Sequence, residues 1–271
     1  MLFNFFKKKT TAIDCRDFSF LETDMHNHIL PGIDDGSSSA EQSLFFIKEL
    51  QQLGFSKFIC TPHIYAEVYP NTGETIAASY DRLAKVAHLN SLPALPLSLA
   101  AEYMVDECLD RYIRQGNIKP LYENYVLVEF SYAVEPKNVE QSIFALQVAG
   151  YQPVIAHPER YAYFRKRNEK YEQLKDLGCA FQLNLLSMLG YYGNEIKEIA
   201  ETLLKNKWYD FAGTDLHHHR HLAALKMMTQ KKKLMNQLMH YPFRNKELQP
   251  QLQATISPVT NTTRKERLVN V

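Results

Sequence analysis

Residues 24–36 read DMHNHILPGIDDG, and this stretch places metal-binding side chains at the end of an extended segment. In a strand, His26 and His28 point to the same side, since side chains alternate between the two faces. Both imidazoles can then reach one metal ion, and Asp24 is expected to orient one of them through a hydrogen bond. An H-x-H pair alone does not establish a metal site, so the interpretation depends on the other strands.

A turn follows this strand. Pro31 and Gly32 reverse the chain and present Asp34 or Asp35 from a loop just above the strand end. A carboxylate in that place can bind the same group of ions as the histidines. Turn formation accounts for the two aspartates equally well, so the residues themselves leave this choice open.

Outward from this stretch, short apolar segments alternate with helical ones. A helix is expected to begin at Ser38, which stands in capping-box spacing with Glu41, and to end at Gly54. A second helix is expected over residues 74–89. The further strand candidates are residues 55–63, 95–103, 125–130, 151–160, 179–186 and 208–215.

Strands that alternate with helices about every 30 residues predict right-handed parallel βαβ units. Seven or so such units favour a closed or nearly closed α/β barrel, and an open doubly wound sheet is the alternative. The chain has 271 residues, which leaves room for one barrel and short extensions. We therefore expect an extension over residues 1–20, a domain over 21–240 and a polar, basic tail over 241–271.

Composition excludes several classes of protein. An apolar content of 45% is too high for a disordered chain, and a formal net charge of +1 argues against a globally basic nucleic-acid binder. The four cysteines are widely separated and follow no secretory signal, which fits a reducing cytoplasm. The first ten residues, MLFNFFKKKT, are too few to span a bilayer, although weak attachment to a membrane surface stays open.

Almost every strand candidate ends in a residue that can bind metal. A barrel would collect these residues on one rim, although they are scattered along the sequence. Glu102 and Glu129 are the most informative, because each follows an apolar run in which an unpaired charge would cost several kcal/mol. The strand-end residues are His26, His28, His63, Glu102, Glu129, His157, Asp215 and His217.

Single members of this set also have simpler interpretations. His63 alone is typical of a structural histidine behind a buried strand. Arg160 can clamp a phosphate with its guanidinium or form an ordinary surface salt bridge. His218, His219 and His221 are expected at the rim or in solvent. Only the combination predicts a site for several metal ions.

With the motifs DMHNHILPGIDDG, CTPH, AAEY, LVEF, AHPER and GTDLH in this order, the chain resembles the polymerase-and-histidinol-phosphatase (PHP) superfamily of metal-dependent phosphoesterases over roughly residues 21–240. It is most similar to the bacterial manganese-dependent protein-tyrosine phosphatases of capsule and exopolysaccharide systems. The resemblance implies a distorted (β/α)7 TIM-like barrel with the metal site at the C-terminal ends of the strands. It also implies three divalent ions, with manganese expected and iron or zinc as alternatives.

The resemblance further implies which residues hold each ion. The sets are His26, His28, Glu102 and Asp215 for the first ion, Glu102, Glu129 and His157 for the second, and Asp35, His63 and His217 for the third. Arg160 matches the phosphate-contacting arginine of the family's H-x-E-R motif. Arg220 is the candidate for the family's second phosphate-contacting arginine, although this arginine usually lies a little further beyond the D-x-H motif.

The implied activity is hydrolysis of phosphotyrosine through a metal-bound hydroxide, since coordination lowers the pKa of water toward about 7. The implied substrate is the tyrosine-rich tail of a bacterial autokinase that regulates capsule or exopolysaccharide synthesis. No nucleophilic cysteine is needed: only Cys108 has an arginine six residues later, and CLDRYIR lacks the glycines of a phosphate-binding loop. We also expect Tyr65 or Tyr132 to contact the substrate.

Two other functions are compatible with the residues. The first is a PHP phosphoesterase for a small metabolite such as histidinol phosphate, with the same metal ions and a different rim. The second is a non-catalytic scaffold that docks on a kinase or a membrane through its basic termini. The scaffold predicts no metal-dependent turnover, so a turnover assay separates it from both enzymes.

Overall fold

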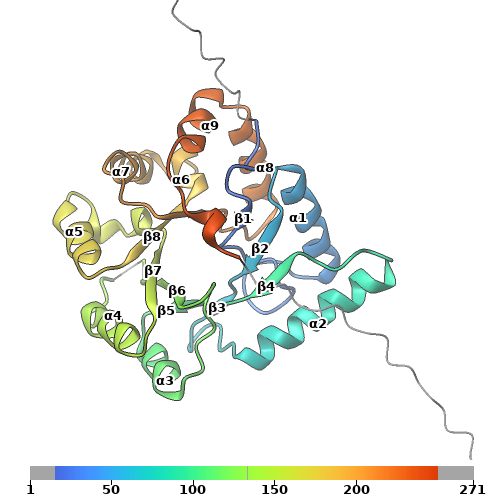
Figure 1. The fold of residues 1–271 in the computed structure, drawn as a ribbon, viewed down its shortest axis with the longest axis horizontal. Coiled ribbons are helices and arrows are strands. Elements are labelled where there is room, and N and C mark those ends of the chain that lie inside the picture. The colour runs from blue at the N-terminus through green and yellow to red at the C-terminus, as the bar shows by residue number, and fades with distance from the viewer. Residues whose placement is uncertain (1–15, 133, 250–271) are drawn as a thin grey trace, which may run out of the picture.

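The strands of this computed structural model lie at the centre of the ribbon and the helices surround them (Figure 1). The structure describes residues 16–132 and 134–249. Strands and helices alternate along the chain, and neighbouring strands pair in parallel throughout both sheets. The predicted α/β class with parallel strands is therefore confirmed.

The elements have the following bounds. The strands are β1 (Thr23–Asp24), β2 (Lys57–Cys60), β3 (His63–Ile64), β4 (Leu97–Leu99), β5 (Glu102–Met104), β6 (Tyr125–Glu129), β7 (Gln152–Ala156), β8 (Ala180–Asn184) and β9 (Phe211–Gly213). The α-helices are α1 (Ala40–Gln52), α2 (Gly73–Leu89), α3 (Glu107–Gln115), α4 (Val139–Val148), α5 (Asn168–Asp176), α6 (Leu185–Leu189), α7 (Asn194–Lys205), α8 (His219–Thr229) and α9 (Lys232–Met239). Short 3-10 helices are η1 (Pro158–Arg160), η2 (Ala162–Phe164) and η3 (Asn245–Glu247).

The start of α1 differs from the prediction by one residue. Ser39, not Ser38, caps the helix, because its hydroxyl accepts a hydrogen bond from the backbone N–H of Gln42 at 3.2 Å. Ser38 instead donates its own N–H to the side-chain oxygen of Gln42 at 2.7 Å. The predicted end is close, since Gly54 follows the helix in the left-handed region at φ 101°.

The strands form two hydrogen-bonded sheets. One has the order β1-β2-β4 and the other the order β3-β5-β6-β7-β8-β9. The predicted strands 55–63 and 95–103 each contribute to both sheets, the first as β2 and β3 and the second as β4 and β5. Pro62 has no N–H to donate at the interruption between β2 and β3, and the N–H of His63 bonds Asp34 Oδ2 at 3.2 Å.

Apolar side chains from both sheets pack together below the strand ends. Alternation along β6 places Leu127 in this inner cluster and Glu129 on the same face, two residues nearer the C-terminal end. A larger apolar layer fills the space between strands and helices. The inner cluster consists of Met25, Ile59, Ala100, Leu121, Leu127, Val154, Ala156, Ala180, Phe211 and Leu248.

The first and last strands are joined by buried side chains. Asp24 accepts hydrogen bonds from the backbone N–H of Thr214 at 3.0 Å and from its hydroxyl at 2.7 Å. Burial raises the pKa of Asp24 to about 6, against the effect of these hydrogen bonds. Asp24 was expected to orient a histidine, and this expectation is wrong because its oxygens tie β1 to the segment after β9.

Asn245 of η3 makes a second connection between the same strands. Its side-chain amide donates to Thr23 O at 2.9 Å and to Ala212 O at 2.7 Å, and its carbonyl accepts from Ala212 N at 2.9 Å. Asn245 and Leu248 are both buried, so residues 241–249 of the predicted tail pack against the body. The boundaries predicted for the three segments stay a prediction.

Asn245→Ala is expected to lower the free energy of unfolding by roughly 2–4 kcal/mol, because buried backbone groups of Thr23 and Ala212 lose their partners. Urea denaturation measures the change. Asn90→Ala is the control, since the exposed Asn90 amide donates to Val86 O, and it should change stability by less than about 0.5 kcal/mol. Equal stabilities of the two variants would contradict the role of Asn245.

Within the described part of the chain, no helix combines the length and the apolar character needed to cross a membrane. The N-terminal stretch for which membrane-surface attachment stays open lies outside the described residues.

Candidate metal centre

The predicted metal ligands converge at the C-terminal ends of the parallel strands. Every one of them belongs to at least one group of three or more residues whose donor atoms lie within 4.8 Å of one another. Most of these side chains are buried, and Asp35, His63 and His217 lie at the outer edge. The nine residues are His26, His28, Asp35, His63, Glu102, Glu129, His157, Asp215 and His217.

The first predicted set forms a tight group. Nε2 of His26 lies 3.3 Å from Nε2 of His28, 3.2 Å from Glu102 Oε2 and 3.3 Å from Asp215 Oδ1. Nε2 of His28 lies 3.4 Å from the same oxygen of Glu102 and 3.4 Å from that of Asp215. Two tetrahedral ligands with bonds of about 2.0–2.2 Å lie about 3.3–3.6 Å apart, so these separations match those of ligands to one ion.

The second predicted set surrounds Glu102 from the other side. His157 Nε2 lies 3.3 Å from Glu102 Oε1 and 3.6 Å from Glu129 Oε1. His63 Nδ1 is also close, at 3.1 Å from Glu102 Oε2 and 3.6 Å from Glu129 Oε2. Glu102 therefore lies between the side chains of the first and the second set.

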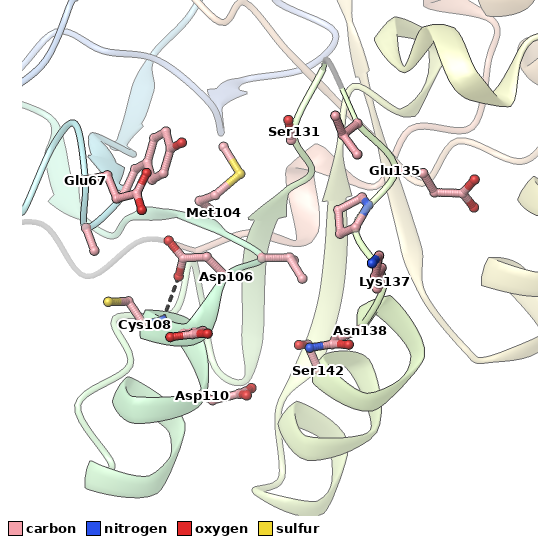
Figure 2. A pocket seen from close by; sticks show the side chains of 16 residues that line it. Glu67, Met104, Asp106, Cys108, Asp110, Ser131, Glu135, Lys137, Asn138 and Ser142 are labelled. Carbon is pink, nitrogen blue, oxygen red and sulfur yellow. Dashed lines mark hydrogen bonds between the residues drawn. The ribbon is translucent and has the colours of Figure 1, made fainter.

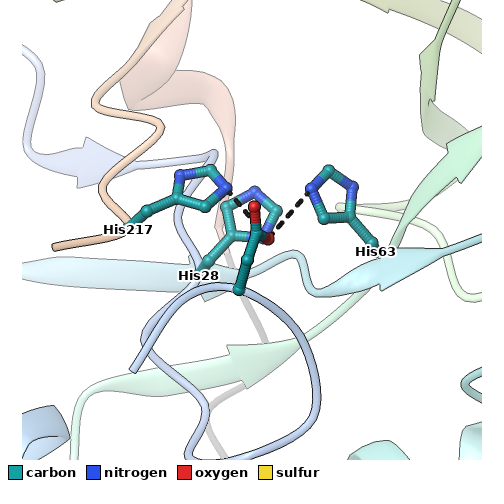
Figure 3. Close-up of side chains that lie close together, drawn as sticks. His28, His63 and His217 are labelled. Carbon is teal, nitrogen blue, oxygen red and sulfur yellow. Dashed lines mark ion pairs between the residues drawn. The ribbon is translucent and has the colours of Figure 1, made fainter. Parts of the chain in front are cut away.

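The third predicted set lies around Asp35. Figure 3 shows the imidazoles of His28, His63 and His217 close together. Asp35 Oδ1 lies 3.6 Å from His63 Nε2 and 3.5 Å from His217 Nε2. The Asp35 side chain is 53% exposed, so this group opens to solvent.

Hydrogen bonds to the opposite ring nitrogens aim the histidines at the cluster. His26 Nδ1 donates to Gln182 Oε1 and His28 Nδ1 donates to Asp34 Oδ2, both at 2.9 Å. His217 Nδ1 donates to the backbone oxygen of Asp215 at 2.9 Å. Because each ring uses Nδ1 for this contact, Nε2 is left free to bind a cation.

Sequence reasoning missed the roles of two amides on β8. Gln182 Oε1 also accepts the backbone N–H of His157 at 3.1 Å, so one side chain holds two candidate ligands. Asn184 donates to Asp215 Oδ2 at 2.9 Å. The sequence did contain a sign of these roles, because two polar residues stand at the end of a buried strand. Amides are poor metal ligands but good hydrogen-bond partners.

The backbone around the cluster is strained and closely packed. His157 and Asp215 have φ angles of 31° and 49°, in the left-handed region that side chains other than glycine rarely adopt. Two glycines allow close approach: a Cβ on Gly36 would lie 2.0 Å from His28 O, and one on Gly213 would lie 2.7 Å from His26 Cβ. Strain of this kind gathers at functional sites.

The charged groups of the cluster change one another's pKa values. Burial lowers the pKa of His26, but the negative charges of Glu102 and Asp215 outweigh burial and raise it to about 9. Burial alone would raise the pKa of Glu102, yet the charges of His26 and His63 hold it well below its usual range. Burial and the charge of Glu102 raise the pKa of Glu129 to about 7.

The cluster has the chemistry that divalent cations require. Neither oxygen of the fully buried Glu102 has a hydrogen-bond partner of ordinary geometry among the described residues. Imidazole and carboxylate donors face one another at ligand separations, and such a set binds manganese, iron or zinc. The residues therefore fit the metal ions that the resemblance implies.

The two predicted arginines lie in different surroundings. Arg160 Nη1 is 2.7 Å from Asp215 Oδ2, and its side chain is 19% exposed. Its guanidinium also lies over the rings of Tyr132 and Tyr192, at 4.7 Å and 4.2 Å from their centroids. Arg220 is exposed on α8, and a phosphate contact for it stays a prediction.

The cysteines within the described residues are not part of the cluster. Cys60 and Cys179 are buried. Burial raises the pKa of the Cys179 thiol to about 12, which makes it a poor nucleophile.

A cavity of about 510 Å³ lies among the segments that follow β3, β5 and β6 (Figure 2). Three of its lining residues, Tyr65, Met104 and Ser131, each stand two positions after a candidate ligand in the sequence. The loops before α3 and α4 form the rest of its wall. The cavity therefore continues outward from the rim on the side of His63, Glu102 and Glu129.

The fold and the cluster together define a parallel α/β protein with a candidate multinuclear metal centre. The chain belongs to the CpsB/CapC family of capsular polysaccharide synthesis, whose model matches residues 22–241. The predicted family is confirmed.

Relatives of this chain carry names that state an activity. Tyrosine-protein phosphatase YwqE of Bacillus subtilis (strain 168) is 30% identical over 199 residues, which are 72% of this chain and 76% of that protein. Tyrosine-protein phosphatase CpsB of Streptococcus pneumoniae is 26% identical over 201 residues, which are 72% of this chain and 82% of that protein.

A solved structure agrees with these relatives. It comes from the work on YwqE of Bacillus subtilis and CpsB of Streptococcus pneumoniae, described as unique metal-dependent tyrosine phosphatases. The match has a TM-score of 0.72 and 26% identity, and it covers 83% of this chain and 93% of that one.

Proposed function

We propose that this chain is a metal-dependent protein-tyrosine phosphatase that acts on a bacterial tyrosine autokinase of a capsule or exopolysaccharide system. The observation that carries the proposal is the convergence of nine metal-competent side chains around the buried, bridging carboxylate of Glu102. Membership in a capsule-synthesis family whose relatives are named tyrosine phosphatases supports it.

The proposed cofactors are three divalent ions, most simply manganese, with iron or zinc as alternatives. When bound, such ions lower the pKa of coordinated water toward about 7 and neutralise charge that develops on the phosphate. The proposed ligands are the three sets already described, of which the first and the second share Glu102. Gln182 and Asp34 keep the rings of His26 and His28 in the orientation that these sets need.

Arg160 is the proposed phosphate ligand of the protein itself. One edge of its guanidinium is held by Asp215, and the planar group has further N–H donors for phosphate oxygens. The buried base of the cluster excludes bulk water around His26 and Glu102, which strengthens these charge interactions. Phenolate is a fairly good leaving group, so a tyrosyl phosphate needs little help from a general acid.

We infer that the two sheets are parts of one distorted (β/α)7 barrel. Hydrogen bonds continue between them, since Ala100 N donates to Cys60 O at 2.9 Å and Glu102 N to Pro62 O at 3.1 Å. At the opposite edge, Asp215 N donates to His26 O at 2.8 Å. These contacts support a ring of strands interrupted near the metal ligands.

A peptide substrate is favoured over a small metabolite by the cavity beside the rim. A chain that carries phosphotyrosine must leave the cluster over the surrounding loops, and the cavity of about 510 Å³ offers a path. A cytoplasmic location is part of the proposal, supported by free thiols at Cys60, Cys108 and Cys179, which fit a reducing compartment.

Manganese-loaded protein is expected to hydrolyse a phosphotyrosine peptide with a kcat/KM at least about tenfold above that for histidinol phosphate, a difference of about 1.4 kcal/mol in transition-state binding. Phosphate release from both substrates at equal metal concentration measures it. A preference for histidinol phosphate would favour the metabolite enzyme. Absence of turnover on either substrate would favour the scaffold.

A further inference from the structure

The guanidinium of Arg160 contacts three other side chains of the protein. Besides its ion pair with Asp215, its guanidinium lies over the ring of Tyr132 at 4.7 Å and over that of Tyr192 at 4.2 Å. Tyr132 follows β6, Arg160 ends η1 after β7, and Tyr192 follows α6. Three separate segments therefore meet at one guanidinium.

Tyr192 is itself fixed relative to the cluster. Its hydroxyl accepts a hydrogen bond from Asn184 Nδ2 at 3.1 Å, and the same amide nitrogen donates to Asp215 Oδ2 at 2.9 Å. Asp215 in turn pairs with Arg160, whose guanidinium lies over the ring of Tyr192. The four residues form a closed circuit, in which the position of each depends on the others.

This circuit has a consequence for phosphate binding. The N–H groups of a guanidinium lie in its plane, so an aromatic ring against its face leaves those donors uncovered. Asp215 occupies one of them. The ring of Tyr192, whose centroid lies 4.2 Å from the centre of the guanidinium, thus limits the rotation of the group.

We propose that Tyr192 is a positioning residue that holds Arg160 in the orientation needed to bind the phosphate group of the substrate. This proposal depends on one part of the proposed function, namely that Arg160 binds the phosphate group. Tyr132 makes a similar contact, but it also lies 3.3 Å from His157 Nε2, so its substitution would disturb a candidate metal ligand. Tyr192 is therefore the cleaner residue to test.

Binding of inorganic phosphate to the manganese-loaded protein, measured by titration calorimetry, tests the proposal without turnover. Tyr192→Leu is expected to weaken phosphate binding about tenfold, whereas Tyr192→Phe keeps the ring and should stay within about threefold of the wild type. Tyr122→Leu, before β6 at the other end of the strands, is the matched control and should bind phosphate as the wild type does. Metal content and thermal unfolding are measured for each variant.

A double-mutant cycle separates positioning from ordinary packing, because Tyr192 also contacts the rings of Tyr191 and His221. If Tyr192 acts through Arg160, Tyr192→Leu should have no further effect on phosphate binding in an Arg160→Ala protein. An equal loss in both backgrounds, or no loss in either, would overturn the proposal. Tyr192→Met, which also lacks the ring, replaces the leucine variant if that protein does not fold.

The outcome is independent of the identity of the natural substrate. A protein that binds phosphate with the expected cycle but does not hydrolyse phosphotyrosine would contradict the proposed function and leave the role of Tyr192 supported. A protein that hydrolyses phosphotyrosine, but in which Tyr192→Leu weakens phosphate binding equally with and without Arg160, would support the proposed function and contradict the role of Tyr192.

Discussion

Glu102→Gln is expected to lower kcat/KM for phosphotyrosine by about three orders of magnitude. Glu102 Oε2 lies 3.1–3.4 Å from nitrogens of His26, His28 and His63, and Oε1 lies 3.3 Å from His157, so one carboxylate serves two proposed ions. A neutral amide removes the negative charge that both ions share. Metal ions contribute several kcal/mol to catalysis, and each 1.4 kcal/mol is a factor of about ten.

The measurement combines steady-state kinetics with the metal content of the purified variant, which should fall below that of the wild type. Glu172→Gln is the matched control, because Glu172 is exposed on α5, and it should retain both activity and metal. A Glu102→Gln protein with wild-type activity and metal content would contradict the bridging role.

Removal of divalent ions with a chelator is expected to abolish phosphotyrosine hydrolysis and to lower the Tm by about 5–10 °C. An ion present at a hundred times its Kd stabilises the folded protein by about 2.7 kcal/mol, and for a domain of this size 1 kcal/mol corresponds to about 2–4 °C. The physical reason is that the buried carboxylates and imidazoles of the cluster lose the cations that balance them.

Thermal unfolding and phosphate release are measured before chelation, after it and after return of manganese, which should restore both. Chelator already saturated with manganese is the control for direct effects of the reagent. Full activity and an unchanged Tm in protein shown to be free of metal would contradict a metal-dependent mechanism.

The sequence was sufficient to predict the α/β class and the residues that converge, because both depend on local patterns. Parallel strands bring their C-terminal ends to one edge, so a polar residue after each apolar run is informative. Glu129 shows this most clearly: the alternation of β6 places it directly above Leu127. The turn sequence alone does not show whether Asp34 or Asp35 is the candidate ligand. The resemblance selects Asp35.

The supporting residues could not be predicted in the same way. Gln182, Asn184 and Tyr192 act through partners that lie far away in the sequence, and their residue types are common in buried strands and loops. For Asp24 the error is different, because the sequence predicted a contact with a histidine ring that the structure does not show. It stands beside the histidines in sequence, but its backbone position turns it toward Thr214, 190 residues away.

Asn245 has a consequence for how the protein is made. Its side chain joins Thr23 to Ala212, so this contact of Thr23 depends on residues that lie more than 180 positions later in the sequence. Contacts of such sequence separation form slowly, because the chain must first close a long loop. During synthesis on the ribosome, His26 and His28 therefore exist for a long time without Asp215 or His217. The complete set of candidate metal ligands is present only after residue 217 has been translated.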